Sequence, residues 1–109
     1  MNLNFSQSIT FRCDDPQQII DLLTEWDRNQ AESDIMGYMG TRILADRERP
    51  GEYVLIADFG IVDPDVPAAD EAARNNDRPE TQAWSDAFRK AIIGEPEYHH
   101  FDEIYRTDG

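Results

Sequence analysis

Two adjacent histidines, His99 and His100, are the only imidazoles in the chain and its clearest candidates for acid–base chemistry. Imidazole titrates near neutral pH, where a general base works best. The residues around them alternate as in a β-strand, so the two side chains point to opposite faces and cannot chelate one metal ion together. We choose His99, which shares a strand face with Phe101 and Tyr105, as the candidate catalytic residue. The alternative is that both histidines are ordinary strand residues.

Asp58 and Arg42 are the charged residues whose positions most need explaining, because both lie within apolar segments. A buried carboxylate must be paired or protonated, and Arg42 on the neighbouring predicted strand could pair with Asp58. Alternatively both serve a site, in which Arg42 binds a carboxylate or phenolate oxygen of a ligand. Arg42 could also be a surface ion-pair partner. We retain both as candidate catalytic residues.

Aromatic and amide side chains form a second group of candidates. Trp84 belongs to the apolar stripe of a predicted helix, so it is either core or the wall of a pocket between helix and sheet, where it could stack on a planar substrate. Asn75 and Asn76 either end a helix by ordinary propensity or form a polar lid over that pocket. The predicted substrate-pocket residues are Asn4, Tyr38, Phe59 and Trp84.

Metal and cofactor sites have little support in the sequence. The single cysteine, Cys13, stands in a strand-like alternation where a small buried apolar side chain fits. There is no glycine-rich phosphate loop, nucleophile elbow or Cys–His pair. We therefore predict no metal and no cofactor. One cysteine cannot form an internal disulfide, which indicates a reducing compartment and, with the features below, a cytoplasmic protein.

Charge and hydropathy restrict the partners. The 23 acidic and 10 basic residues give a formal net charge of -13. Binding to nucleic acid depends on Lys and Arg that neutralise phosphates, so we expect neither nucleic acid nor an anionic membrane as partner. No apolar run approaches the roughly 18 residues of a membrane span, and no signal peptide is evident.

The elements that must position these residues follow from periodicity and turn signals. Alternation of apolar and polar residues predicts strands, and apolar residues spaced three and four apart predict helices. Strands are predicted over 3–13, 37–45, 53–60 and 97–106, and helices from Pro16, Pro67 and Asp77. This order predicts one α+β domain, 1–109, with a ferredoxin-like split β-α-β fold, a four-stranded antiparallel sheet and its helices on one side.

The segment Tyr53–Gly60 is apolar on both faces, which is typical of a strand inside a sheet. The helices of so short a chain can cover only one face. Burying the other face against an identical face would remove apolar area from water at roughly 25 cal/mol per Å². We therefore predict a homodimer that forms through the sheet faces.

Three segments carry a resemblance to a known family: the helix entry Asp15–Ile20, the hairpin strand Gly37–Leu44 and the apolar strand Tyr53–Gly60. In sequence and order they resemble the antibiotic-biosynthesis-monooxygenase-type domains, the dimeric α/β-barrel family. The resemblance implies that two sheets face each other in a dimer. Members of this family include cofactor-free quinone-forming monooxygenases, haem-degrading enzymes and proteins without an assigned activity.

The haem-degrading members resemble this chain least at their functional positions. The resemblance implies that a haem-degrading member needs an Asn on the first strand, a Trp at the end of the third strand and a His on the following helix. Here Phe59 stands at the Trp position, the helix over 67–76 has no histidine, and Asn4 lies nearer the strand start than the family's Asn, where Ser8 or Thr10 falls.

The resemblance therefore implies a cofactor-independent monooxygenase whose planar, reduced aromatic substrate itself reduces dioxygen. Its pocket would lie between sheet and helices, lined by Asn4, Tyr38, Arg42, Trp84 and His99. The alternative is a non-catalytic dimeric ligand-binding or assembly module, which needs only the apolar strands. A cavity of some hundreds of cubic ångströms with Arg42, Asp58 or His99 pointing into it would favour the enzyme.

Overall fold

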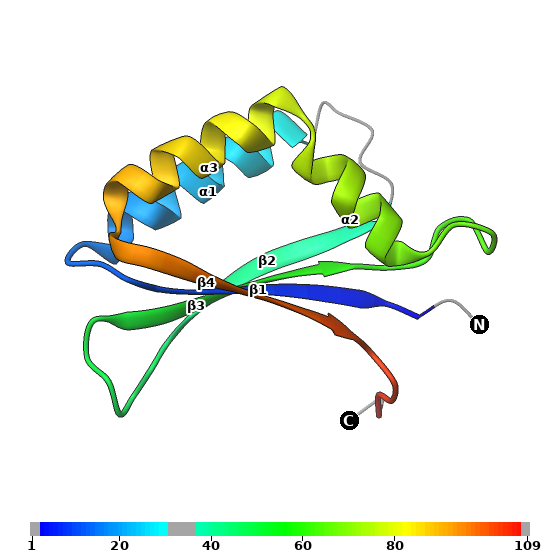
Figure 1. Ribbon diagram of the computed structural model, residues 1–109, viewed down its shortest axis with the longest axis horizontal. Coiled ribbons are helices and arrows are strands. Elements are labelled where there is room, and N and C mark those ends of the chain that lie inside the picture. The colour runs from blue at the N-terminus through cyan, green and yellow to red at the C-terminus, as the bar shows by residue number, and fades with distance from the viewer. Residues whose placement is uncertain (1–2, 31–36, 108–109) are drawn as a thin grey trace.

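A computed structural model describes residues 3–30 and 37–107, in which one four-stranded antiparallel sheet carries three helices on a single face (Figure 1). The strand order is β2-β3-β1-β4, which is the predicted ferredoxin-like α+β fold. The strands are β1 (Phe5–Arg12), β2 (Tyr38–Ala45), β3 (Glu52–Phe59) and β4 (Ile93–Asp102), and the helices are α1 (Pro16–Gln30), α2 (Ala68–Asn76) and α3 (Pro79–Ala91).

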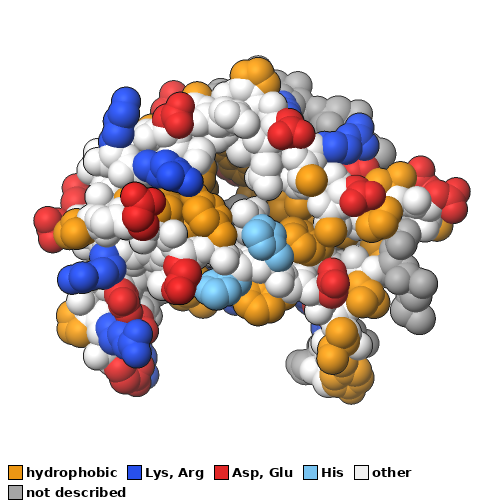
Figure 2. Space-filling view, viewed as in Figure 1, with side chains coloured by type: hydrophobic (Ala, Val, Ile, Leu, Met, Phe, Trp, Pro, Cys, Tyr) orange, Lys and Arg blue, Asp and Glu red, His pale blue; other side chains and the backbone are white. Residues whose placement is uncertain are grey.

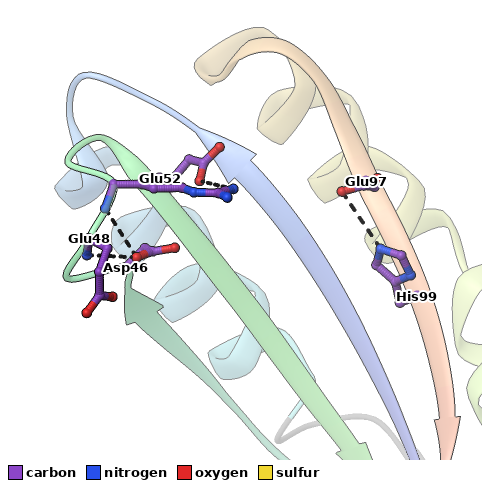
Figure 3. Close-up of polar contacts among 6 residues, drawn as sticks. Asp46, Glu48, Glu52, Glu97 and His99 are labelled. Carbon is purple, nitrogen blue, oxygen red and sulfur yellow. Dashed lines mark hydrogen bonds and ion pairs between the residues drawn. The ribbon is translucent and has the colours of Figure 1, made fainter.

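Short-range chemistry sets several of these boundaries. The backbone N–H of Gln17 donates to Asp15 Oδ1 at 3.1 Å, so the carboxylate before Pro16 caps α1 as its sequence predicts. In the β2–β3 hairpin the Asp46 carboxylate accepts the backbone N–H of Glu48 at 2.9 Å (Figure 3). Gly51, at φ +89°, supplies the left-handed residue of the same turn.

The pairing of β2 with β3 shifts register between Tyr38 and Gly40. This is the irregularity that the glycine inside the strand predicts.

Two predicted boundaries are wrong. Asp77 does not cap the last helix: it closes α2, and α3 begins at Pro79 without a side-chain cap. Strand β4 runs from Ile93 to Asp102 and not over the predicted 97–106, so Gly94 (φ +74°), which precedes the predicted strand, lies inside the observed one. A register shift opposite 10–12 of β1 accommodates the irregular segment, and β4 tolerates it because it is an edge strand.

The core lies between the sheet and the helices. Ile9, Phe11 and Leu55 project from the sheet and pack with Ile19 of α1 and Phe88 of α3. The rings of Phe11 and Phe88 meet edge to face with centroids 5.1 Å apart. This cluster fixes the two long helices over one face, while the opposite face carries none of the described helices (Figure 1).

We call that opposite surface the open face. It is of mixed polarity: hydroxyls occupy most outward positions of β1, as the alternation of that strand predicts, and charged residues interrupt the apolar ones of the other strands. Its outward-facing residues are Ser6, Ser8, Thr10, Arg12, Arg42, Leu44, Glu52, Val54, Ile56, Asp58, Glu97, His99 and Phe101.

Candidate functional site

A cavity of about 430 Å³ lies between the helices and the sheet. Figure 2 shows its opening, bordered by hydrophobic side chains, between the helical layer and the sheet. Ile9, Leu55 and Ala57 form its floor, and the other lining side chains come from all three helices and all four strands. The volume falls in the range of small-molecule sites.

The cavity exists because one row of the sheet is underfilled. Thr41, Ala57 and Gln7 are in register on adjacent strands and face the helices. Neighbouring positions on this face carry large apolar residues that fill the layer, but these three side chains are small or polar. In the sequence Gln7 is the one residue that breaks the apolar row of the first strand, so the signal for the cavity was present there.

Three aromatic rings form one end of the cavity. Trp26 and Tyr38 meet edge to face with centroids 5.2 Å apart, and Tyr38 lies 5.6 Å from the ring of Phe59. The Tyr38 hydroxyl shares a short hydrogen bond with the Thr41 hydroxyl. Burial raises the pKa of Tyr38 above its ordinary value, while the bond to Thr41 acts in the opposite direction. Tyr38 therefore presents a neutral phenol to the cavity at physiological pH.

At the other end Trp84 stacks flat on Phe88, with centroids 4.9 Å apart and planes inclined by 9°. Its Nε1 is the one buried side-chain polar atom in the described residues that has no hydrogen-bond partner. The guanidinium of Arg89 lies over the ring of Tyr98, 5.9 Å from its centroid, and donates to the Tyr98 hydroxyl at 3.4 Å. Cationic and aromatic groups therefore meet where α3 faces β4.

A chain of hydrogen bonds connects the three helices beside the cavity. Trp26 Nε1–H donates to Thr81 Oγ1 at 3.2 Å, and the Thr81 hydroxyl donates to Asn75 Oδ1 at 3.2 Å. Trp26 belongs to α1, Asn75 to α2, and Thr81 to α3, and all three residues line the cavity. We call this chain the Trp26–Thr81–Asn75 relay.

Three of the residues predicted for the pocket line this cavity: Tyr38, Phe59 and Trp84. Asn4 does not, contrary to expectation; its Nδ2 donates to Glu103 Oε2 at 3.0 Å, where β1 begins and β4 ends. Since Asn4 alternates with the buried Phe5, its side chain projects away from the helices.

The three residues predicted to be catalytic also lie outside the cavity, on the open face, so the expectation that Arg42 and His99 line the same pocket as Trp84 is wrong. Asp58 accepts a hydrogen bond from Ser6 Oγ at 2.6 Å and does not pair with Arg42. His99 Nε2 lies 3.8 Å from the Glu97 carboxylate. Figure 3 shows these two side chains together on β4, with the helices behind the sheet. The cause is strand alternation, which puts Tyr98 and not His99 on the helix side.

Sequence reasoning missed several lining residues. Trp26 ends the apolar stripe of its helix, and Tyr98 alternates with His99 and so can face the helices. The sequence pattern alone could therefore have placed both residues in the layer between helices and sheet. Thr81 and Arg89 could not, because only the packing of α3 brings them to the cavity. Among the described residues no cluster of three or more His, Cys, Asp or Glu could hold a metal ion. None of the described helices is long and apolar enough to cross a bilayer.

The raised pKa of Tyr38 has a measurable consequence. Because the ionised phenol is disfavoured in the folded state, the free energy of unfolding should be independent of this group below about pH 10 and fall as the pH rises toward the folded-state pKa. Ultraviolet titration of tyrosinate in the wild type minus that in Tyr38→Phe should show one phenol with a midpoint above its unfolded value. A difference curve at or below that value would contradict the buried position of Tyr38.

Comparisons with known proteins support the fold from a different direction. No protein-family profile matches the sequence, and no curated protein matches it either. Among solved structures, a mutant form of the cofactor-independent oxygenase SnoaB from Streptomyces nogalater superposes with a TM-score of 0.74 at 16% identity, covering 97% of this chain and 98% of that chain.

A second solved structure, a provisionally named antibiotic biosynthesis monooxygenase from Nitrosomonas europaea, superposes with a TM-score of 0.72 at 12% identity, covering 98% of this chain and 96% of that chain. At such low sequence identity, the structural likeness shows the fold of this chain and does not establish a reaction. The chain therefore has the fold of the antibiotic biosynthesis monooxygenases, as the order of its elements predicts.

Proposed function

We propose that the protein is a cofactor-independent oxygenase that binds a small, planar, reduced aromatic molecule in the cavity between helices and sheet. The observation that carries the proposal is the cavity itself: about 430 Å³, with Trp26, Tyr38 and Trp84 among its lining residues and polar groups between them. Its likeness in fold to SnoaB, which is described as a cofactor-independent oxygenase, supports the choice of reaction class.

The reaction class needs no group beyond the substrate and dioxygen. An anthrone-type CH₂ loses a proton to give an electron-rich enolate, which reduces dioxygen. One oxygen atom becomes the new carbonyl, and the other leaves as water with the two hydrogens of the CH₂. The aromatic residues would hold the rings, and Asp86, the one carboxylate among the described lining residues, is the candidate acceptor of the first proton.

We also propose that the protein forms a homodimer through the open face. Leu44 and Phe101 on this face are 40% and 54% exposed, an apolar area that a partner would cover. Charge does not oppose this pairing. Although the chain carries a formal charge of -13, the charged residues of the open face are nearly balanced, with Arg12 and Arg42 against Glu52, Asp58 and Glu97. A second copy can therefore approach this face without a large charge repulsion, although the chain as a whole is acidic.

Oxygen consumption tests the reaction. With a panel of anthrones and quinols, the wild type should consume dioxygen and form the quinone in chelator-treated buffer. Ala57→Leu, which fills the cavity floor, should reduce kcat/KM by about tenfold or more, because a side chain that occupies the site competes with the substrate. Ala83→Leu makes the same change on the exposed surface of α3 and should leave the rate unchanged. Equal rates in the two variants would contradict the assignment of the cavity.

A ligand-binding module without catalysis is the second candidate. It is favoured by one observation: His99, Asp58 and Arg42 all lie outside the cavity, which leaves Asp86 as its only carboxylate among the described residues. Binding of the aromatic panel without oxygen consumption would support this candidate.

A further inference from the structure

We infer that Asn75 is the residue that selects the ligand, by donating a hydrogen bond from its side-chain amide to a carbonyl or phenolate oxygen on the aromatic ring system. This inference rests on the proposed function, because it concerns the same cavity. It adds the chemical class of the ligand: a planar ring with an oxygen acceptor at one edge, in preference to the corresponding hydrocarbon.

The Trp26–Thr81–Asn75 relay runs from Trp26 to Asn75. An indole N–H can only donate, so the hydroxyl of Thr81 accepts from Trp26 and can give its own proton to Asn75. In the structure the Asn75 atom that faces Thr81 is the carboxamide oxygen, which accepts that proton. The two N–H groups of Asn75 are left to donate elsewhere, and the orientation of the amide is fixed from two other helices.

The amide nitrogen is without an acceptor in the described part of the chain. Asn75 is only 6% exposed, it lines the cavity, and its single described side-chain hydrogen bond engages its oxygen. Although the residue is buried, its Nδ2 is not among the fully buried atoms that lack a partner, so the atom is accessible to a small molecule and its two N–H groups can donate to a ligand oxygen or to water. A ligand oxygen would complete a site whose other half is already held by Thr81.

The surroundings of Asn75 define the rest of the ligand. Trp26 and Trp84 are flat apolar surfaces that suit fused rings, and Tyr38 keeps its proton because burial raises its pKa. A hydrocarbon would leave the donors of Asn75 without water and without a partner. A ketone, quinone or phenolate would satisfy them, which is the basis for discrimination.

A matched pair of probes tests the inference. 9-Fluorenone and fluorene are planar tricyclic molecules that differ only in the presence of one carbonyl. Their Kd values would be measured by calorimetry for the wild type, Asn75→Asp, Asn75→Leu and Thr81→Val. Both Asn75 variants are close in size to Asn, and fluorene binding reports whether the cavity of each variant is intact.

We expect fluorenone to bind the wild type and both Asn75 variants to raise its Kd about tenfold, while the Kd of fluorene changes by less than about twofold. Thr81→Val, which frees the amide without removing it, should raise the Kd of fluorenone by less. The infrared carbonyl stretch of fluorenone should fall on binding to the wild type and not on binding to Asn75→Leu, a change that a purely structural role of Asn75 would not produce.

Two results would overturn the inference, and they are distinguishable. If the variants weaken fluorenone and fluorene equally, or if the carbonyl stretch is unaffected by Asn75, the cavity binds aromatic molecules but Asn75 does not select them. If neither probe binds the folded wild type, the proposed function itself fails, and the role of Asn75 fails with it.

Discussion

Ile56→Asp should convert the proposed dimer into a monomer. Ile56 is half-buried at the centre of the open face, in register with Ser8 on one side and Arg42 on the other. In a two-fold symmetric interface each substitution occurs twice, so two carboxylates would be buried against apolar area. A penalty of several kcal/mol follows, which is more than about a thousandfold in the dimer dissociation constant.

Sedimentation velocity at micromolar concentration measures this change. Ile20→Asp makes the same substitution on α1, at a position 41% exposed, and should remain dimeric. A wild type that sediments as a monomer, or an Ile56→Asp variant that remains a dimer, would contradict pairing through the open face.

Phe88→Ala should produce the largest loss of stability. Phe88 is fully buried, meets Phe11 edge to face and carries the stacked ring of Trp84. Truncation removes the transfer free energy of the ring and leaves a void, at a cost of about 3–5 kcal/mol. Since the total stability of such domains is about 5–15 kcal/mol, the variant should be close to unfolding at moderate temperature.

Urea denaturation gives this free energy, and an unchanged m-value would show that the unfolded state is not affected. Phe88→Leu keeps most of the volume and should cost less than half as much. A loss below about 1 kcal/mol for Phe88→Ala would mean that the helices do not pack on the sheet through this residue.

Much of the fold could be predicted because it depends on local chemistry. Apolar alternation identifies β1 and β3, and the Asp15-Pro16 pair identifies the start of α1, since a cap and a proline act within one turn. The boundary between α2 and α3 and the start of β4 were misplaced. Asp77 is compatible with the start of one helix or with the end of another, and Gly94 with a helix end or with an irregular strand. Only tertiary packing decides between the alternatives at each position.

The site was predicted only in part for a similar reason. Tyr38, Phe59 and Trp84 line the cavity. Each is a large residue, and the apolar periodicity of its strand or helix shows that its side chain faces the layer between sheet and helices. The chemical types of His99, Asp58 and Arg42 made them candidate catalytic residues, but strand alternation puts them on the open face. The sequence offers Asn75 as a helix end or as a polar lid, and it gives no signal at Thr81; the meeting of three helices brings both residues to the cavity.

A crystal structure of the protein with 9-fluorenone would show directly whether the cavity binds an oxygen-bearing aromatic molecule. We expect the ring system inside the cavity beneath α1 and α3, with its carbonyl oxygen within hydrogen-bond distance of the Asn75 amide nitrogen. A cavity closed by its own side chains, or a ligand held only on the open face, would contradict this expectation.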